Sequence, residues 1–509
     1  MTSDRRTAIG IFLLVFAVYA LLAGGHTYSS DEEGLYITTQ ALVERRTPAI
    51  VVDDTNNGVL PITTGRTGAP VTVGGFGQSV AAVPLYVLGS IAGTGIRGGN
   101  YGNYPERLFV GWTNPIVTAL GVVLVFLTTR LLGTERRWAV RLSLVYAFAT
   151  YAMPHAKTFF SEPLSTTLAV SSLYFLVRSH QRSSFLDAAL AGASIGFALH
   201  ARASVGLFLP FLGVYLLWSW SRPRVLVPRA LLAAVAFGGG FAVPLALLLV
   251  TNWWRFGKPL NFGYASIPLS YPVQEGLYGL FLSPGKSVLL YAPVVALGLA
   301  SPFFVEAKHR AIVVLCVTMG LANAVFFARF PYWHGDHSFG PRYLIMSIPF
   351  WVVPVGLLLH RAAWRRALGV AAMVGVVVAL LGSALYFNQY FHIAERTSVA
   401  KLEILDDGPN YWRKMHYEPY WSPIAGHARA LPAVVGNSID RLDGDDADLQ
   451  EYPGTTNEQY GWYFAPPQLD SWVYWLFPTH GPKRFLLLVP VFLGLGLVGL
   501  RLLRPALRP

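Results

Sequence analysis

The strongest constraint on the fold of this chain is its series of long hydrophobic segments. Twelve of them are read as membrane-spanning helices, at residues 8–22, 107–131, 138–154, 163–179, 185–200, 204–220, 229–250, 288–304, 310–328, 342–360, 366–387 and 484–503. Apolar helices of this length cross a bilayer, where only helices and closed barrels satisfy all their backbone hydrogen bonds. The sequence therefore predicts an all-α, polytopic membrane protein.

The composition supports this class and excludes others. Hydrophobic residues make up 53% of the chain and charged residues only 13%, which is outside the range of soluble domains. The net charge of +12 would suggest nucleic acid binding in a soluble protein, but here it follows membrane topology, so no nucleic acid partner is expected. The single cysteine, Cys316, excludes an intrachain disulfide and a cysteine-ligated metal site.

The basic residues set the orientation of the spans. Arg5 and Arg6 precede the first span, and most other basic loop residues fall on the same side of the twelve-span arrangement. By the positive-inside rule both termini are cytoplasmic in a multi-pass plasma-membrane protein, and so are Thr134 and Arg222. Counting residues 80–96 as a span would break this bias, so they are predicted to form an interfacial or re-entrant helix.

Three regions follow from this topology. Residues 1–387 form a multi-span core, in which residues 24–106 are a long first extracytoplasmic loop. Residues 388–482 hold 13 of the 27 acidic residues and many turn signals, which predicts an extracytoplasmic loop or small domain of unassigned role. Residues 483–509 provide the last span and a cytoplasmic tail.

The first extracytoplasmic loop opens with three consecutive carboxylates, Asp31, Glu32 and Glu33. Charges of this density cannot lie in hydrocarbon, so they face water where the first span ends. The two preceding serines each stand three residues before a glutamate, as in a capping box that begins a helix over residues 31–46. Both functions are compatible, because one glutamate can cap the helix while Asp31 points into a cleft.

Four cations are expected on the same side of the membrane. Arg342 lies in Phe339-Gly-Pro-Arg-Tyr343, where a tight turn can present its planar guanidinium to a lipid phosphate. The others lie near outer span ends: Lys157, Arg202 and Lys286. Several of them could surround one phosphate, although each alone also fits an anchor at the membrane interface.

The evidence for a metal site is weaker. His334 and Asp336 provide ligand types that suit zinc or manganese, but their spacing matches no zinc signature, so loop packing is favoured and a divalent metal stays open. The segment 53–58 resembles the start of a calcium loop, yet Thr64 occupies the position of the bidentate glutamate. Residues 443–448 are read as a solvated acidic loop, with calcium as the minority interpretation.

Together these fragments resemble a known family. The acidic start Asp31-Glu32…Tyr36…Ala41-Leu42 is similar to that of the glycosyltransferases of the C superfamily, which use lipid-linked sugars and include protein O-mannosyltransferases and aminoarabinose transferases. Further similar fragments are Phe76-Gly-Gln-Ser79, Lys157-x-Phe-Phe-Ser-Glu-Pro163, Arg255-Phe-Gly-Lys-Pro259, Ser283-Pro-Gly-Lys286 and Gly340-Pro-Arg-Tyr343. The resemblance covers about residues 1 to 390 and specifies the superfamily better than the substrate.

The resemblance implies an integral membrane glycosyltransferase with an extracytoplasmic active site. The donor would be a polyprenyl monophosphate sugar, and the acceptor a hydroxyl of a lipid, glycan or protein. Asp31, with Glu32 beside it, would be catalytic and would take the acceptor proton while the anomeric carbon is inverted. Arg342 would stabilise the departing phosphate, helped by Lys157, Arg202 or Lys286. Four further residues would contact the acceptor or support the site: Glu162, His155, His334 and Asp336.

Two alternatives stay open. A secondary transporter also fits twelve spans with both termini inside, but transporters place their key charges near the bilayer midplane rather than at outer span ends. A polymerase or ligase of lipid-linked glycans would share the donor chemistry and the outer face. The sequence specifies neither the sugar, the acceptor, the metal dependence nor the oligomeric state.

Overall fold

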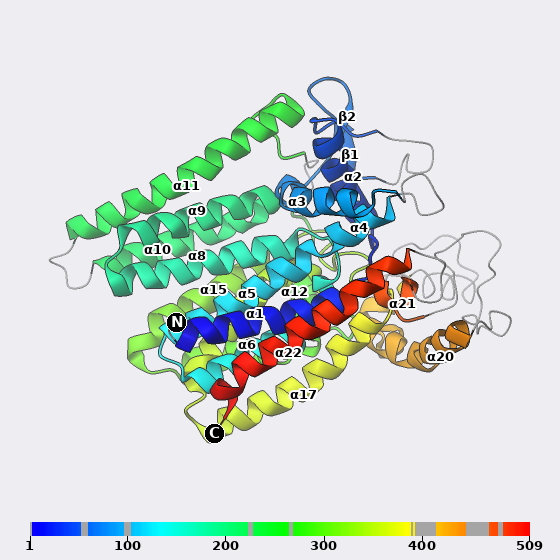
Figure 1. Ribbon diagram of the computed structural model, residues 1–509. Coiled ribbons are helices and arrows are strands. Elements are labelled where there is room, and N and C mark those ends of the chain that lie inside the picture. The colour runs from blue at the N-terminus through cyan, green and yellow to red at the C-terminus, as the bar shows by residue number, and fades with distance from the viewer. Residues whose placement is uncertain are drawn as a thin grey trace.

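The helices of the protein run roughly side by side, and the shorter elements gather at one end of this bundle (Figure 1). The structure is a computed structural model that describes residues 3–51, 60–95, 103–221, 227–263, 268–387, 390–391, 414–443, 468–476 and 482–508. Both termini lie at the opposite end of the bundle from the shorter elements (Figure 1). The described elements therefore form an all-α membrane protein, to which a two-stranded sheet is added.

Seven helical segments within the described residues are long and apolar enough to cross a membrane. They are α1 (Ser3–Leu22), α4 with α5 (Tyr104–Gly111, Thr113–Leu131), η1 with α10 (Ala203–Phe208, Leu209–Trp220), α11 (Val227–Phe256), η4 with α15 (Ala307–His309, Arg310–Ala328), α17 (Ala362–Ala384) and η10 with α22 (Lys483–Leu487, Leu488–Leu507). These segments coincide with seven of the twelve expected spans, because apolar length is a local property of the sequence.

The other five expected spans are shorter, more polar or divided into pieces. They correspond to α6 (Arg136–Phe148), α8 (Glu162–Arg182), α9 (Phe185–Ala201), α13, α14 and η3 (Val288–Tyr291, Val294–Ala300, Ser301–Phe303), and η5, α16 and η6 (Arg342–Ser347, Ile348–Val352, Val353–Leu358). The last of them, residues 342–358, is almost entirely buried by neighbouring helices. Trp351, for example, is fully buried.

Small residues allow some of these helices to approach closely. A Cβ atom at Gly192 of α9 or at Gly240 of α11 would overlap the backbone of the other helix. Contacts of this kind replace the hydrophobic driving force that is missing between helices in lipid.

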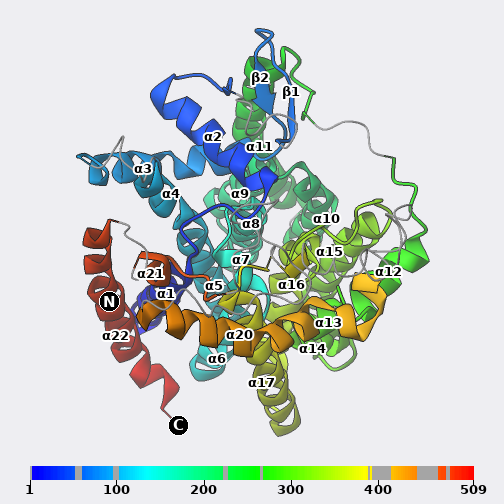
Figure 2. The same cartoon turned by 90° about the vertical axis from the view of Figure 1, so that its right-hand side faces the viewer.

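The remaining elements lie at the end of the bundle away from the termini. They are α2 (Ser30–Glu44), β1 (Ile62–Thr64), β2 (Pro70–Thr72), α3 (Phe76–Ala92), α7 (Ala152–Ala156), α12 (Val273–Leu282), η7 (Pro419–Trp421), α20 (Pro423–Asp443) and α21 (Trp472–Leu476). The two strands are antiparallel, with Thr63 opposite Val71. Figure 2 looks onto this end of the bundle, and α3 and α20 run across the view. A helix was expected near residues 80–96, and α3 forms over residues 76–92; it is shorter than the seven segments that could cross a membrane.

Candidate active site

The three consecutive carboxylates lie in the first turn of α2 and point to three different environments. Ser29 caps this helix, and its Oγ accepts a hydrogen bond of 3.4 Å from the backbone N–H of Glu32. The reciprocal half of a capping box is absent at this serine: the Glu32 side chain accepts from the backbone N–H groups of Tyr28 and Phe159, at 3.2 and 2.8 Å. Glu32 thus joins two loops instead of completing the cap.

Asp31 is the carboxylate that faces solvent and a cation. About half of its side chain is exposed (48%), and its Oδ2 lies 3.1 Å from Nη2 of Arg342. Arg342 itself is almost buried, and its Nε lies 3.1 Å from Oε1 of Glu162. The same Glu162 oxygen accepts a 2.7 Å hydrogen bond from Arg202. The structure therefore brings together four of the predicted site residues in the order Asp31, Arg342, Glu162 and Arg202.

Aromatic rings support both guanidinium groups of this row. The Arg342 guanidinium carbon lies 4.4 Å from the centre of the Phe160 ring, and that of Arg202 lies 4.9 Å from the centre of the Tyr343 ring. A guanidinium tolerates such stacking because it is planar and weakly hydrated. Buried Glu162 offsets part of the charge, so the two arginines are fixed at the base of the site with Asp31 at its exposed side.

The turn before Arg342 sets the direction of its side chain. Gly340 has a φ of +82°, and a Cβ there would lie 2.9 Å from the Tyr291 ring. The turn needs glycine at this position, since the left-handed backbone strains other residues. Lys286 supports the same turn from below: its Nζ donates to the carbonyls of Asp336, Ser338 and Gly340, at 3.0, 2.7 and 3.3 Å.

Lys286 is therefore used differently from what the sequence suggested. Its side chain is fully buried, and burial lowers the pKa of its ammonium group well below the usual value. His155 is also buried and supports the same region, because its Nε2 lies 3.0 Å from the carbonyl of Phe339. Burial lowers the pKa of His155 to about 3, so its ring is neutral near pH 7. Both residues hold the Arg342 turn in place.

Glu32 is the buried member of the acidic triplet. Burial raises the pKa of Glu32 to about 8, although its two backbone hydrogen bonds oppose this shift. Its second oxygen, Oε1, is buried with no hydrogen-bond partner among the described residues. Glu33, in contrast, is held by Arg107 through two hydrogen bonds of 2.6 Å, an ion pair that the sequence did not indicate.

Lys157 lies in a separate buried cluster built around Asp470. The Asp470 Oδ2 atom is 2.8 Å from Lys157 Nζ and accepts a 2.6 Å hydrogen bond from the Tyr28 hydroxyl. Its other oxygen is 2.8 Å from Nε2 of His26. Burial raises the pKa of Asp470, but Lys157 and His26 together hold it well below its usual value. The sequence indicated neither Asp470 nor His26. No local sequence feature identifies a contact between residues that are more than 300 positions apart.

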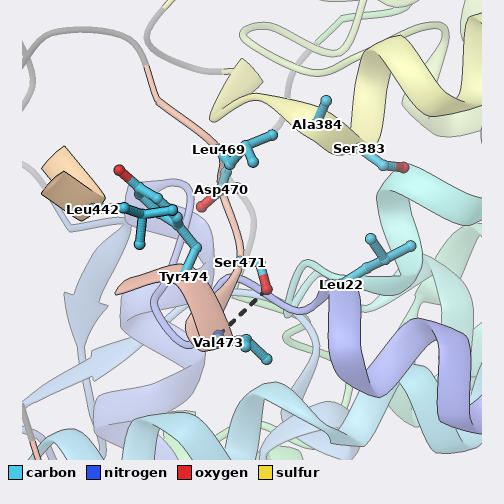
Figure 3. A pocket seen from close by; sticks show the side chains of 9 residues that line it. All are labelled: Leu22, Ser383, Ala384, Leu442, Leu469, Asp470, Ser471, Val473 and Tyr474. Atoms are coloured by element: carbon cyan, nitrogen blue, oxygen red, sulfur yellow. Dashed lines mark hydrogen bonds between the residues drawn. The ribbon is translucent and has the colours of Figure 1, made fainter. Parts of the chain in front are cut away.

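The Asp470 cluster borders a cavity of about 450 Å³ at the ends of α1 and α17 (Figure 3). Most side chains that line it are apolar, among them Leu22, Leu442 and Leu469. The segment that carries Asp470 is tied to both helices by backbone hydrogen bonds from Asp470 to Ala384 and from Trp472 to Ala23. Part of the expected region 388–482 is thus fastened to the helical core.

No group of three or more metal-ligating side chains occurs in the described parts of the chain. His334 Nδ1 accepts a 3.1 Å hydrogen bond from the backbone N–H of Asp336, and the Asp336 carboxylate lies 3.9 Å from the same nitrogen. These two residues shape the loop before Arg342. The expected calcium-like segment 53–58, and most of the acidic segment 443–448, lie outside the described residues.

Comparison with known proteins agrees with the class that this fold and site suggest. Residues 108–247 match the dolichyl-phosphate-mannose-protein mannosyltransferase family, which confirms the resemblance to C-superfamily glycosyltransferases over this segment. The segment contains Lys157, Glu162 and Arg202, whereas Asp31 and Arg342 lie outside it.

Among solved structures, the chain is similar to the crystal structure of ArnT from Cupriavidus metallidurans bound to undecaprenyl phosphate. The two sequences are 16% identical, the TM-score is 0.47, and the alignment covers 90% of this chain and 83% of the other. No curated protein matches the chain.

Proposed function

We propose that this protein is a membrane glycosyltransferase that moves a sugar from a polyprenyl monophosphate donor to an acceptor hydroxyl. The observation that carries the proposal is the contact between half-exposed Asp31 and almost buried Arg342, 3.1 Å apart at one end of the helical bundle. In this proposal Asp31 is the base and Arg342 binds the phosphate, and their contact supports it because group transfer from a phosphate leaving group requires both groups at one site. The family matched by residues 108–247 supports the same class of reaction.

In the proposed reaction, the acceptor oxygen forms a bond to the anomeric carbon as the bond from that carbon to the phosphate oxygen breaks. The acceptor proton goes to Asp31, and the electron pair leaves with the polyprenyl phosphate. Attack opposite the leaving group inverts the anomeric centre. Arg342 stabilises the charge that grows on the phosphate, because a preorganised cation away from bulk water acts most strongly there.

The Asp31–Arg342 contact suggests how donor binding prepares the base. Without donor, the Asp31 carboxylate is engaged by Nη2 of Arg342. A donor phosphate would compete for Nη2 of Arg342, while Glu162 keeps hold of its Nε. Asp31 would then be released from Arg342 and free to accept the proton of the acceptor when the donor is in place. Glu162 and Arg202 act in this scheme as positioning residues for Arg342.

The location of these charges favours transfer over transport. Asp31 lies in the first turn of α2 and Arg342 begins η5, and α2 lies at the end of the bundle that carries the shorter elements. Coupling sites of transporters are expected near the bilayer midplane. We assign this end to the outer face of the membrane, with both termini in the cytoplasm, from the charge bias of the loops. The donor lipid would then lie in the outer leaflet.

The test is release of polyprenyl phosphate by purified protein from a panel of polyprenyl phosphate sugars, with and without candidate acceptors. Acceptor-dependent release in wild type, lost in Asp31→Asn and kept in Glu418→Gln, is the expected result. Glu418 is a suitable control because it is an exposed carboxylate of the C-terminal segment. Release that is equal in all three proteins would refute the assignment of the site, and analysis of the product would separate single transfer from polymerisation.

A further inference from the structure

Asp336 is a second half-exposed carboxylate close to Arg342. Its side chain is 54% exposed, compared with 48% for Asp31. The preceding residue, Gly335, packs directly on Arg342, because a Cβ atom at this glycine would lie 3.0 Å from Cβ of Arg342. The proposed reaction uses Asp31 and Arg342 and leaves the Asp336 carboxylate without a function.

The backbone of Asp336 is held through both of its polar groups. Its N–H donates a 3.1 Å hydrogen bond to Nδ1 of His334. Its carbonyl accepts from Nζ of Lys286 at 3.0 Å and from the N–H of Ser338 at 2.8 Å. The residue has a φ of +51°, a left-handed conformation that aspartate adopts more readily than most residues. The loop therefore fixes the position from which the side chain projects, without using its carboxylate.

The carboxylate of Asp336 is not neutralised within the described parts of the chain. At ion-pair distance it meets only Nδ1 of His334, 3.9 Å away. This nitrogen already accepts the N–H of Asp336, so it has no proton to donate. Burial also lowers the pKa of His334 well below its usual value, which keeps the ring neutral. Among the described residues, the Asp336 carboxylate therefore has no hydrogen-bond partner, and its acceptor oxygens are available to a ligand.

The charges around Asp336 place it beside the reacting groups. Partial burial raises the pKa of its carboxyl group, while the positive charge of Arg342 lowers this pKa and the negative charge of Asp31 raises it. In the proposed donor complex, Arg342 holds the phosphate and Asp31 takes the acceptor proton. The anomeric carbon lies between these two groups, and the sugar ring is bonded to it. A side chain close to both residues therefore faces the sugar.

We propose that Asp336 accepts hydrogen bonds from hydroxyl groups of the donor sugar and thereby selects the sugar. The inference rests on the proposed function and names a specificity-determining residue for it. A carboxylate offers two acceptor oxygens, which suit a pair of adjacent hydroxyl groups, and its hydrogen bonds are charge-assisted. A site built to bind a hydroxyl discriminates strongly against the analogue that lacks it. The expected donor thus carries free hydroxyl groups on the side of the ring that faces Asp336.

The test compares the best polyprenyl phosphate sugar with its monodeoxy analogues, each lacking one hydroxyl, in the polyprenyl phosphate release assay with one fixed acceptor. Asp336→Gly removes the carboxylate without straining the left-handed backbone. It should lower kcat/KM for the parent donor by about tenfold or more, as expected for a lost hydrogen bond to a charged group. For one deoxy donor the same substitution should have little effect, because that donor has already lost the contact.

A milder variant and a control accompany this comparison. Asp336→Asn keeps the side-chain shape and one acceptor oxygen, so its loss should be smaller than that of Asp336→Gly. Glu418→Gln is the matched control for the change from acid to amide, since Glu418 is exposed. Thermal unfolding checks the folding of each variant, and Asp336→Asn decides the outcome if Asp336→Gly fails to fold.

Four results would overturn the inference while the proposed function stands. Wild-type activity of Asp336→Gly would show that the carboxylate is only solvated. An equal loss for the parent and every deoxy donor would assign Asp336 to the folding of the loop. A loss that changes with a deoxy acceptor instead would place the contact on the acceptor, and a loss that millimolar manganese restores would identify a cation ligand. Absence of release by wild type from every donor would overturn the proposed function and this inference with it.

Discussion

At the scale of single residues, the acidic triplet at the start of α2 divides into three environments. Asp31 is half exposed beside Arg342, Glu32 is buried between two loops, and Glu33 forms an ion pair with Arg107. Only Asp31 is open to a substrate while it contacts a cation that could hold a phosphate. The proposed roles of the three residues can therefore be separated by conservative substitutions.

Asp31→Asn should reduce turnover by about a hundredfold or more if Asp31 is the base, because asparagine keeps the shape but cannot accept the proton. Glu33→Gln should have a smaller effect, since it weakens an ion pair and leaves the base intact. Release of polyprenyl phosphate under saturating donor measures both. A fully active Asp31→Asn variant would contradict the proposed base.

Substitution of Arg342 tests the proposed phosphate contact. Arg342→Ala should lower turnover by roughly a hundredfold, as expected for loss of one preorganised charge at the leaving group. Arg342→Lys keeps the charge but cannot reach both Asp31 and Glu162 with a planar fork, so its loss should be smaller. Near-wild-type activity of both variants would identify Arg342 as an anchor at the membrane border.

Glu32 predicts a pH dependence of stability. The folded protein keeps a proton on Glu32 up to about pH 8, whereas the unfolded chain releases it near the usual value of 4.5, so folding takes up a proton between these values. The contribution of Glu32 to the free energy of unfolding therefore falls as the pH rises through this window, and is level above it. Glu32→Gln lacks this contribution.

Thermal unfolding of wild type and Glu32→Gln in detergent, at several pH values from about 5 to about 8, measures the difference. We expect wild type to lose stability relative to the variant as the pH rises. A difference that is constant across this range would show that Glu32 is ionised in the folded protein.

The sequence indicated Asp31 and Arg342 because each lies beside a recognisable local signal, a helix start and a Gly-Pro turn. It did not indicate that Lys157 and Lys286 are engaged by Asp470 and by backbone carbonyls. Such partners are set by packing between distant segments. A basic residue near the end of a span has the same local sequence whether it contacts a ligand or supports a loop.

At the scale of elements, Asp470 joins parts of the chain that are far apart in sequence. Asp470 contacts Tyr28 and Lys157. The two loops that carry these residues also provide both backbone N–H donors to Glu32, those of Tyr28 and Phe159. The segment around α21 thereby holds the two loops that position the acidic end of α2. Its effect on the site is structural, through the placement of these loops.

Asp470→Asn should destabilise the protein by about 3–5 kcal/mol, because it leaves the buried Lys157 ammonium without a carboxylate. The double variant Lys157→Met, Asp470→Leu removes both charges and should recover most of this loss. Thermal unfolding in detergent compares the variants, with exposed Glu418→Gln as the control. Equal loss in the single and double variants would show that packing, rather than the ion pair, stabilises the contact between the Asp470 segment and the two loops.

At the scale of the whole molecule, the orientation in the membrane can be tested with cysteine labelling. Thr134 is buried, so exposed Arg182 at the end of α8 is a better probe for the face of the termini. Thr67, in the exposed turn between β1 and β2, probes the other face. A membrane-impermeant maleimide added to intact cells should label Thr67→Cys but not Arg182→Cys. The native Cys316 is buried and should give no background.

Labelling of Arg182→Cys from outside would reverse the orientation and move the proposed active site to the cytoplasmic face. The position of the long spans could be predicted from the sequence, because an apolar helix of sufficient length is a local signal. The divided helices at residues 288–303 and 342–358 resemble spans in the sequence but consist of short pieces. Such breaks are tolerated because neighbouring parts of the protein satisfy the backbone hydrogen-bonding groups that each break exposes.

The contacts of Asp470 with Tyr28 and Lys157 also impose an order of events during biosynthesis. Chains emerge from the ribosome N-terminus first, so α1, α2 and most of the bundle are in the membrane before residue 470 is made. Until then, Lys157 has no carboxylate to pair with, and the loop that carries Tyr28 lacks its support. A nascent chain would therefore contain Arg342 before the loop that precedes Asp31 is held in place. If the proposed function is correct, transfer begins only once the segment around Asp470 has closed onto the first loop of the chain.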